Sequence, residues 1–582
     1  MTGEPYLVLR DFRVWFGKRR GFLASLRKAE PEYVRAVDGI DLDIRKGEVY
    51  CLVGESGCGK TTTGKAILRL VPPTGGDVLL NPPTEVLREY EAGRETGRAE
   101  ALERIRQRWS LSYAEKVVWK PKDALRFLAL ALAAMAAGTG VALGLFLAFT
   151  AAGLGEWELL AHLLAGTAVA VVGGLPLLPA SRRIPALLLP FAFGASLLGR
   201  LLGMAVLSGG IGAAASAYAA LWGTNFAQVV GLLMEPLFAM LAAGYAAKFS
   251  LAYWRSRRGE GDKLRKLRKS LQIIFQDPYE SLNPKRSVYD TIAEPLIVNG
   301  LTGSRVETEA RVERALDDAG LRHARDFLFR YPHELSGGQR QRVSIAGALV
   351  LEPDFIVADE PVSMLDVSIR TEILETLLQL RKDKGLTYLF ITHDLSLAWV
   401  LSDRIAVMYL GKIVEEGPKR EVVKSPRHPY TKALISVVPA PDPDRRHGRT
   451  ILKGERPDPS DIPPGCRFHP RCPVAIGSCG WTAEETREEL LKIAASAPEI
   501  AGELQGLAVE GPAKLMLTGA SDRAEAWVRE TVASQAETWR SLQAVQHIER
   551  SNGSLRLAIE GGREPILKSV APDVRVACHL AG

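Results

Sequence analysis

The stretch GEVYCLVGESGCGKTTTGKAILRLV, from Gly47 to Val71, reads as a strand, a glycine-rich loop and a helix. Its apolar run Val49–Val53 predicts a buried strand of a parallel sheet. The loop glycines let backbone N–H groups turn toward a phosphate, and a helix that starts near Lys60 adds its positive end. In this pattern Lys60 reaches the β- and γ-phosphates and the Thr61 hydroxyl binds Mg²⁺. The alternative is a chance glycine-rich turn. The candidate phosphate-binding residues are Gly54, Glu55, Ser56, Gly57, Cys58, Gly59, Lys60, Thr61 and Thr62.

A second motif places two acidic residues at the end of another apolar run. In DFIVADEP the four apolar residues Phe355–Ala358 are followed by Asp359 and Glu360. A buried strand there brings Asp359 to the metal through water, and Glu360 is placed to polarise the attacking water as a general base. The alternative is a strand that ends in two solvated acids. Together the two motifs predict an enzyme that acts on a nucleoside triphosphate.

A third motif, LSGGQ at Leu335–Gln339, lies between the first two in the chain. With all three, the chain resembles the ATP-binding subunits of ABC transporters over roughly residues 1–83 and 264–480. The resemblance implies an α/β, P-loop NTPase fold of the ABC type with a helical subdomain. It also implies ATP hydrolysis with Mg²⁺ as the metal.

The resemblance implies roles for residues at matching positions. Gln276, in IIFQDP, matches the Q-loop residue that senses Mg²⁺ and the transmembrane partner. Asp366 matches the D-loop aspartate, and His393 matches the switch histidine that contacts the γ-phosphate. An aromatic residue should stack on adenine: Tyr33 is the first choice and Phe16 the second, although a lone aromatic there fits the core equally well. The residues that would cap the γ-phosphate of an ATP held by another subunit are Ser336, Gly337, Gly338 and Gln339.

A single phosphate loop makes only half of such a site, because the γ-phosphate stays open to water on one side. A second polypeptide that supplies SGGQ backbone completes the enclosure. The chain has one phosphate loop and one LSGGQ. We therefore expect it to form a dimer around two ATP molecules, with a copy of itself or with a similar ATPase subunit.

Three longer segments narrow the resemblance to the oligopeptide and dipeptide importers: FQDPYESLNP (275–284), SPRHPYTKALISVVPAPDP (425–443) and GCRFHPRCP (465–473). This branch implies ATPase pairs beneath two transmembrane permease subunits, supplied by an external solute-binding protein. The solute stays open, since an ATPase subunit does not touch it and some archaeal relatives import sugars. Two alternative functions are a self-contained transporter or exporter that uses its own helices, and a non-transport ABC clamp protein.

Four of the six cysteines lie outside the nucleotide motifs, at Cys466, Cys472, Cys479 and Cys578. Grouped thiolates suit iron–sulfur clusters or zinc, and in some related importer subunits similar cysteines hold a [4Fe–4S] cluster. The spacings here are not CxxC knuckles, and about 98 residues separate the last two. A [4Fe–4S] cluster, zinc and ordinary buried thiols therefore all stay open, and His469 is expected to be structural. Residues 482–574 form an added module, in which 521–549 predict one amphipathic helix.

About 180 residues, 84–263, separate the two parts of the nucleotide-binding domain, and they contain four apolar spans. The spans, near 125–150, 159–180, 184–207 and 227–250, each reach the roughly 20 residues that a membrane-crossing helix needs. Lys and Arg lie before the first span, in the connection between the second and third spans, and after the fourth span, but are absent from the other two connections. Because basic loops stay in the cytoplasm, both ends of the block are expected there. Residues 84–123 would form a stalk about 60 Å long if helical. The alternative is a buried soluble insert.

The charge pattern and the N-terminus suggest where the protein works. The formal charge of +7 and the basic flanks of the apolar block favour a membrane surface over nucleic acid. The start, MTGEPYLVLRDF, lacks the features of a signal peptide. We expect a multi-pass protein of the cell (cytoplasmic) membrane with its ATPase in the cytoplasm. Its predicted parts are the first (1–83) and second (264–424) halves of the nucleotide-binding domain, the insertion (84–263) and an importer-type C-terminal region (425–582).

Overall fold

The computed structural model describes residues 4–17, 33–110, 267–438, 450–452 and 454–581. The chain divides into two compact units, 1–113 with 265–582 and 114–264. The second unit, which includes all four predicted membrane spans, lies outside the described residues. Within the described ranges, no helix combines the length and the hydropathy of a membrane span.

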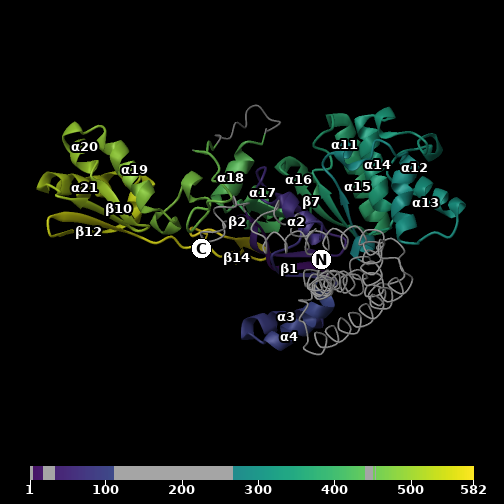
Figure 1. The fold of residues 1–582 in the computed structure, drawn as a ribbon, viewed down its shortest axis with the longest axis horizontal. Coiled ribbons are helices and arrows are strands. Elements are labelled where there is room, and N and C mark those ends of the chain that lie inside the picture. Colours follow the sequence, from purple (N-terminus) through teal and green to yellow (C-terminus); the bar gives the residue numbers. More distant parts are fainter. Residues whose placement is uncertain (1–3, 18–32, 111–266, 439–449, 453, 582) are drawn as a thin grey trace, which may run out of the picture. The chain divides into compact units, whose positions relative to one another are not determined.

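An eight-stranded sheet carries the nucleotide motifs (Figure 1). Its strand order is β14-β15-β9-β8-β3-β7-β6-β5, and the five strands from β8 to β5 run parallel. β3, β6 and β7 are buried along their whole length, as expected for apolar runs covered on both faces. The predicted parallel α/β class is confirmed. The strands are β3 (Val49–Val53), β5 (Leu271–Ile274), β6 (Phe355–Asp359), β7 (Thr387–Thr392), β8 (Arg404–Tyr409), β9 (Lys412–Pro418), β14 (Lys568–Ala571) and β15 (Val574–Val576).

Helices connect the strands of this sheet and place three loops at one edge. Since parallel strands share a carboxyl edge, the loops after β3, β6 and β7 meet there. These loops contain the phosphate loop, Glu360 and His393. The connecting helices are α2 (Lys60–Ile67), α15 (Val367–Lys384), α16 (Leu395–Leu401), α17 (Lys419–Lys424) and α18 (Pro429–Ser436).

A second, antiparallel sheet has the order β2-β1-β4, from β1 (Pro5–Gly17), β2 (Tyr33–Arg45) and β4 (Gly75–Leu80). A hairpin of α3 (Thr84–Thr96) and α4 (Ala99–Trp109) follows β4. The Tyr90 hydroxyl and the Arg106 Nε both donate to Asp77 of β4, at 2.5 and 2.8 Å. The expectation of one continuous stalk from residue 84 is therefore wrong for the described part, because Gly97 ends α3 in a left-handed conformation and α4 folds back.

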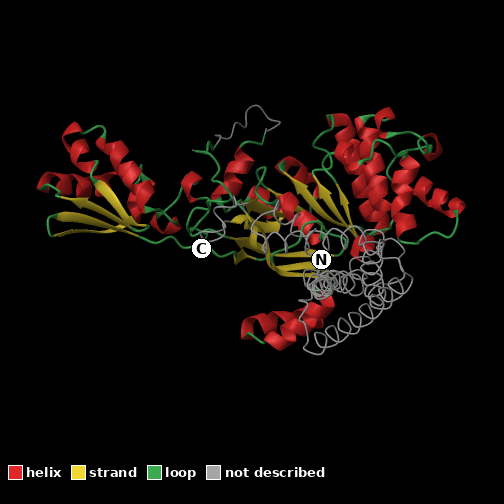
Figure 2. Cartoon of the chain, viewed as in Figure 1, coloured by secondary structure: helices red, strands yellow, loops and turns green. Residues whose placement is uncertain are grey.

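A helical lobe follows β5 and precedes β6 in the chain, as the resemblance implies. Figure 2 shows its helices in red at the right of the view. Its helices begin at serine caps: the hydroxyl groups of Ser287, Ser304 and Ser336 each accept a backbone N–H from the first turn. Buried Leu296, Val312 and Val343 belong to the core of this lobe. Its elements are α11 (Pro278–Ser281), α12 (Val288–Val298), α13 (Arg305–Asp318), α14 (Gly337–Leu349), and the 3₁₀ turns η4 (Ala324–Asp326) and η5 (Pro332–Glu334).

The added module is a four-stranded antiparallel sheet, of order β10-β11-β13-β12, covered by helices. The prediction of a single helix over 521–549 is wrong, because α21 ends at Gln535 and the chain enters a 3₁₀ turn and then strand β12. β12 pairs with β13 along its length, which satisfies the backbone groups that face β13. The elements are α19 (Ala483–Ala494), α20 (Pro498–Leu504), β10 (Leu507–Gly511), β11 (Lys514–Thr518), α21 (Asp522–Gln535), η8 (Arg540–Ala544), β12 (Val545–Ser551) and β13 (Ser554–Ile559).

Candidate active site

The phosphate loop connects β3 to α2 through a strained turn. Gly59 has φ 109°, and a Cβ there would collide with the carbonyl oxygen of Ala36. Only glycine fits that backbone. The Lys60 Nζ donates to the carbonyl oxygens of Gly54 (2.8 Å) and Glu55 (3.0 Å), and the side chain is buried. The loop is thus closed on itself by the lysine that the motif assigns to phosphate.

Two predicted metal ligands meet at the first turn of α2. The Thr61 hydroxyl donates to Asp359 Oδ1 at 2.9 Å, although 298 positions separate the two residues. Burial raises the pKa of Asp359, while the hydrogen bond from Thr61 opposes that shift. A hydroxyl and a carboxylate oxygen at one place are ligands that suit Mg²⁺.

Two further predicted residues, Gln276 and His393, converge on the carboxylate of Glu360. Glu360 Oε2 accepts from Gln276 Nε2 at 3.3 Å and lies 3.0 Å from His393 Nδ1. The Glu360 backbone is left-handed (φ 46°), and its N–H donates to the Ile391 carbonyl at 3.0 Å. The side chains come from the loops after β5, β6 and β7, so the sheet edge brings them together.

The signature residues occupy the start of α14. The Ser336 hydroxyl accepts from the Gln339 N–H (3.3 Å), and Gln339 Oε1 accepts from the Ser336 N–H (3.0 Å). Gly338 packs on α15, since a Cβ there would lie 2.6 Å from Ile369. Asp366 caps α15 by accepting from the Ile369 N–H. Within the described ranges, no hydrogen bond or ion pair joins the signature to the chain's own phosphate loop.

The two candidate adenine-stacking residues lie on the antiparallel sheet. Tyr33 and Phe16 are 42% and 43% exposed, so neither is a core residue. The Tyr33 ring lies 6.0 Å from Trp15, over which the Arg35 guanidinium sits at 5.1 Å. Trp15 and Arg35 therefore belong to the same surface, which the sequence reasoning did not identify.

The C-terminal region supplies contacts to the phosphate loop that the sequence reasoning also missed. The Arg471 guanidinium bonds the Glu55 carboxylate at 3.0 and 3.3 Å. The Tyr430 hydroxyl accepts the Glu55 N–H at 2.9 Å, and Arg456 donates to the Ser56 carbonyl. The available signal was the pair of arginines inside GCRFHPRCP, each next to a cysteine.

The four predicted metal-binding cysteines gather beside the turns η6 (His469–Arg471) and η7 (Gly477–Cys479). Burial is the main cause that raises the pKa of Cys466 to about 12 and of Cys472 to about 11, and the neighbouring thiols, including Cys578, add to it. Among the described residues, however, no group of three or more His, Cys, Asp or Glu is arranged to hold a metal ion. The described residues thus gather the thiols without forming the predicted cluster site. His469 is fully buried and its Nδ1 lies 2.8 Å from the Cys466 carbonyl, in keeping with a structural role.

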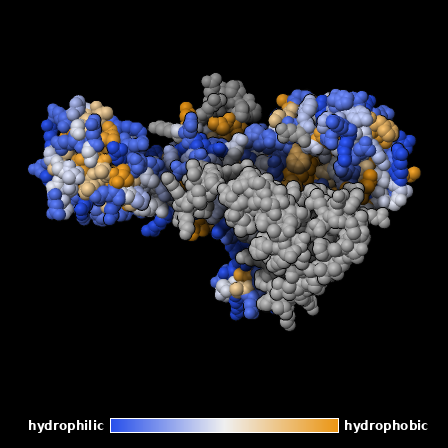
Figure 3. Space-filling model, viewed as in Figure 1, coloured by the Kyte–Doolittle hydropathy of each residue, from blue (hydrophilic) through white to orange (hydrophobic). Residues whose placement is uncertain are grey.

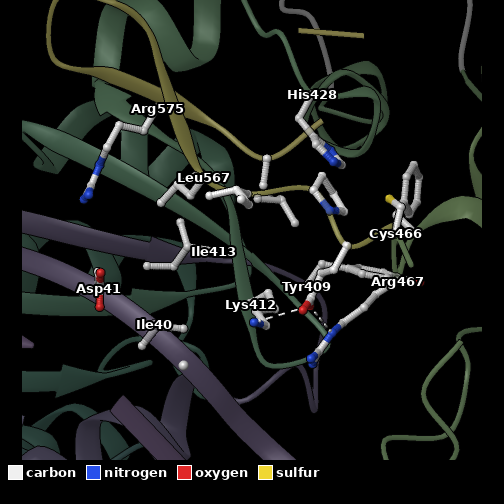
Figure 4. A pocket seen from close by; sticks show the side chains of 17 residues that line it. Ile40, Asp41, Tyr409, Lys412, Ile413, His428, Cys466, Arg467, Leu567 and Arg575 are labelled. Carbon is white, nitrogen blue, oxygen red and sulfur yellow. Dashed lines mark hydrogen bonds and ion pairs between the residues drawn. The ribbon is translucent and has the colours of Figure 1, made fainter. Parts of the chain in front are cut away.

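A cavity of about 250 Å³ lies beside Cys466, outside the phosphate loop (Figure 4). Lys412 Nζ and Arg467 Nε both lie 3.3 Å from Glu564 Oε1. Arg575, the third cation of the lining, is paired with Glu416. Each of these three cations of the lining therefore already has a carboxylate partner.

Comparisons with known proteins agree with this geometry. Residues 37–127 and 237–363 match the family described as ABC transporter. Residues 414–479 match the family described as oligopeptide/dipeptide transporter, C-terminal region. The first match is interrupted between 127 and 237, inside the predicted insertion.

Three curated relatives are similar to part of the chain. A putative peptide import ATP-binding protein of Brucella ovis is 47% identical over 226 residues, which are 39% of this chain and 70% of the relative. A putative oligopeptide transport ATP-binding protein of Bacillus subtilis is 50% identical over 223 residues, 38% of this chain and 67% of the relative. A dipeptide transport ATP-binding protein of Escherichia coli is 46% identical over 223 residues, which are 38% of this chain and 64% of the relative. Among solved structures, a dimeric bacterial ABC transporter cassette has 17% identity and a TM-score of 0.37, over 71% of this chain and 99% of that one.

Proposed function

Because this chain belongs to the peptide-import ATP-binding subunits of the ABC transporter family, we propose that it hydrolyses ATP to drive uptake of oligopeptides or dipeptides. One observation carries this proposal: the phosphate loop, the Thr61–Asp359 pair and Glu360 meet at one edge of the sheet. That edge therefore holds phosphate-binding backbone, metal ligands and a base within one site.

In the proposed mechanism, Lys60 exchanges its bonds to the Gly54 and Glu55 carbonyls for the β- and γ-phosphates. Thr61 and Asp359 would hold Mg²⁺, which neutralises phosphate charge when bound. Glu360 accepts the proton of the attacking water. The contacts from His393 and Gln276 hold Glu360 in place until the γ-phosphate arrives.

We propose that the site is completed by the signature of a second ATPase subunit. The signature's Ser336 and Gln339 hydrogen-bond each other rather than the phosphate loop of the same chain. The backbone N–H groups of Gly337 and Gly338 lie in the first turn of α14, where the helix dipole favours a phosphate. Tyr33 is exposed and is proposed to stack on the adenine of the ATP held by its own phosphate loop.

Two permease subunits and an external solute-binding protein are the further partners that we propose. Gln276 begins the segment that leads into the helical lobe, and Tyr279 just after it is 66% exposed. Other exposed apolar side chains of the lobe are Ile297, Val298 and Phe329. Figure 3 shows apolar patches on this lobe, at the right of the view. Exposed apolar side chains on the lobe that follows Gln276 in the chain suit a surface that carries the movement of the ATPase to a permease.

We propose from the sequence that the insertion anchors the motor in the cytoplasmic membrane. Support comes from the four apolar spans, the basic residues around them and the interruption of the family match there. Alkaline carbonate washing of vesicles tests this proposal. The intact chain is expected to stay in the membrane pellet while a peripheral control protein is released; release of the chain would overturn the anchor.

For the four cysteines we propose a [4Fe–4S] cluster, with zinc as the second candidate. Support comes from the gathering of Cys578 with three thiols that precede it by about 98 residues or more. The sulfur atoms would have to approach one another, since no metal group is formed among the described residues. Anaerobically purified protein should show iron, or zinc, in metal analysis. A sample free of both metals would end this proposal.

The main experiment measures ATP turnover and partner capture by the full chain. Phosphate release should require Mg²⁺, and permease subunits should copurify with the chain from native membranes. Absence of ATP hydrolysis would refute the enzyme assignment. Peptide transport by the purified chain alone in liposomes would instead favour a self-contained transporter.

A further inference from the structure

Glu55 of the phosphate loop is held at three points. Its carboxylate bonds Arg471, its N–H donates to the Tyr430 hydroxyl, and its carbonyl accepts from the Lys60 Nζ. The first two partners belong to the C-terminal region, 416 and 375 positions away. The third is the lysine that reaches the phosphates. The position of Glu55 therefore links the C-terminal region to the phosphate-binding lysine.

The Arg471–Glu55 pair is a two-bond contact in a mostly buried place. Both terminal nitrogens of Arg471 face the two carboxylate oxygens, and such forked pairs fix orientation as well as distance. The side chains are only 11% and 29% exposed, so solvent screens the pair little. Arg471 Nε has no hydrogen-bond partner among the described residues, which leaves Glu55 and the Tyr409 hydroxyl (3.5 Å) as its contacts.

The second contact leads back to the same segment. Tyr430 packs against Phe468, with ring centroids 5.3 Å apart, and Tyr409 packs against both rings. Phe468 is buried and lies between Cys466 and Cys472 in the sequence. One contact on Glu55 thus comes from the segment that holds the gathered thiols, and the other comes from a residue of α18 that packs against that segment.

The turn η6 ties Arg471 to these thiols through the backbone. The Arg471 N–H donates to the Phe468 carbonyl (3.0 Å), and the Cys472 N–H donates to the His469 carbonyl (3.1 Å). Cys472 follows Arg471 directly, so a shift of the Cys472 backbone moves the peptide bond that the two residues share. A change at the thiols therefore reaches Glu55 without a long path.

We propose that Arg471 is a positioning residue of the ATP site, which sets the phosphate loop through Glu55 according to the state of the cysteine segment. This inference rests on the proposed function, because it assigns control of the same ATP site. It makes ATP affinity, rather than the rate of the chemical step, the quantity that the cysteine segment adjusts.

The test measures ATP affinity and the split between KM and kcat on the full chain. Arg471→Gln and Glu55→Gln each remove the pair from one side, and Arg471→Lys keeps the charge without the fork. We expect both Gln variants to raise the Kd and KM for ATP by roughly three- to tenfold with kcat within about twofold. The double variant should bind ATP no more weakly than the weaker-binding of the two single variants. Arg471→Lys should have a Kd for ATP between those of the native chain and Arg471→Gln. Arg325→Gln, which breaks an exposed pair with Glu313, is the matched control and should leave both quantities unchanged.

The link to the thiols is tested by Cys472→Ala in two backgrounds. We expect this change to shift the Kd for ATP in the native chain but not in the Arg471→Gln chain. Three results would overturn the inference. Cys472→Ala could shift the Kd for ATP equally in both backgrounds, or Arg471→Gln and Glu55→Gln could have additive effects. The Kd could also be unchanged in these variants. If Arg471→Gln fails to fold, Glu55→Gln, on a loop, measures the same pair. Native protein that binds no ATP would instead refute the proposed function, so the two failures are distinguishable.

Discussion

Glu360→Gln is the substitution for which the structure gives the sharpest expectation. It removes a charge from the carboxylate on which His393 Nδ1 and Gln276 Nε2 converge at 3.0 and 3.3 Å, while the side chain keeps its shape. The backbone is held by the bond from the Glu360 N–H to Ile391, which the change does not touch. General-base catalysis contributes about 10²–10⁴-fold, so kcat should fall by that factor, equivalent to about 3–5 kcal/mol of barrier.

The affinity for ATP should survive this change, because Lys60, Thr61 and Asp359 are intact. The variant is therefore expected to accumulate as an ATP-bound dimer, seen as an ATP-dependent increase in mass by light scattering, while phosphate release almost stops. Glu352→Gln is a matched control, since Glu352 also has positive φ (54°) on the turn before β6 and touches no predicted site residue. Unchanged turnover in Glu360→Gln would remove Glu360 from the role of base.

Three further predictions concern the loop, pH and the core. Gly59→Ala should abolish binding of a fluorescent ATP analogue, because its φ of 109° and the contact with Ala36 exclude a Cβ; Gly385→Ala, also at positive φ but in open space, should bind normally. Burial lowers the pKa of His428 to about 3, below its unfolded value of about 6.5. The unfolded chain thus binds the extra proton, and stability should fall as pH drops from about 6.5, by up to roughly 1.4 kcal/mol per pH unit; a urea midpoint that is equal at pH 7.5 and 5.5 would refute this. Leu52→Ala, in the fully buried β3, should cost about 2–5 kcal/mol in urea unfolding, and a loss below about 1 kcal/mol would contradict the packing.

The nucleotide-binding domain was predictable where the sequence pattern is local. The apolar runs of β3 and β6 end directly at the phosphate loop and at Asp359, so strand, loop and chemistry occupy adjacent positions. The Gly97 that separates α3 from α4 is also a local signal, which the stalk hypothesis overlooked.

The rest depends on contacts between distant parts of the chain. Trp539, Leu542, Val545 and Ile548 recur every three residues, a spacing that continues a helix, and only pairing with β13 makes the last two part of a strand. In the same way, nothing near Glu55 in the sequence indicates its bond to Arg471, because long-range partners leave no periodic pattern. Sequence patterns identify elements, whereas these contacts are selected by tertiary packing.

The central claim is that each ATP site takes its phosphate loop from one chain and its signature from another. Mixing two inactive full-length variants tests it: Lys60→Ala disables the loop and Ser336→Arg disables the signature. In a mixed dimer, one site combines the intact loop of the Ser336→Arg chain with the intact signature of the Lys60→Ala chain. The account predicts that the mixture regains ATP hydrolysis that neither variant shows alone. A mixture that stays inactive, while the native chain hydrolyses ATP as a dimer of itself, would contradict it.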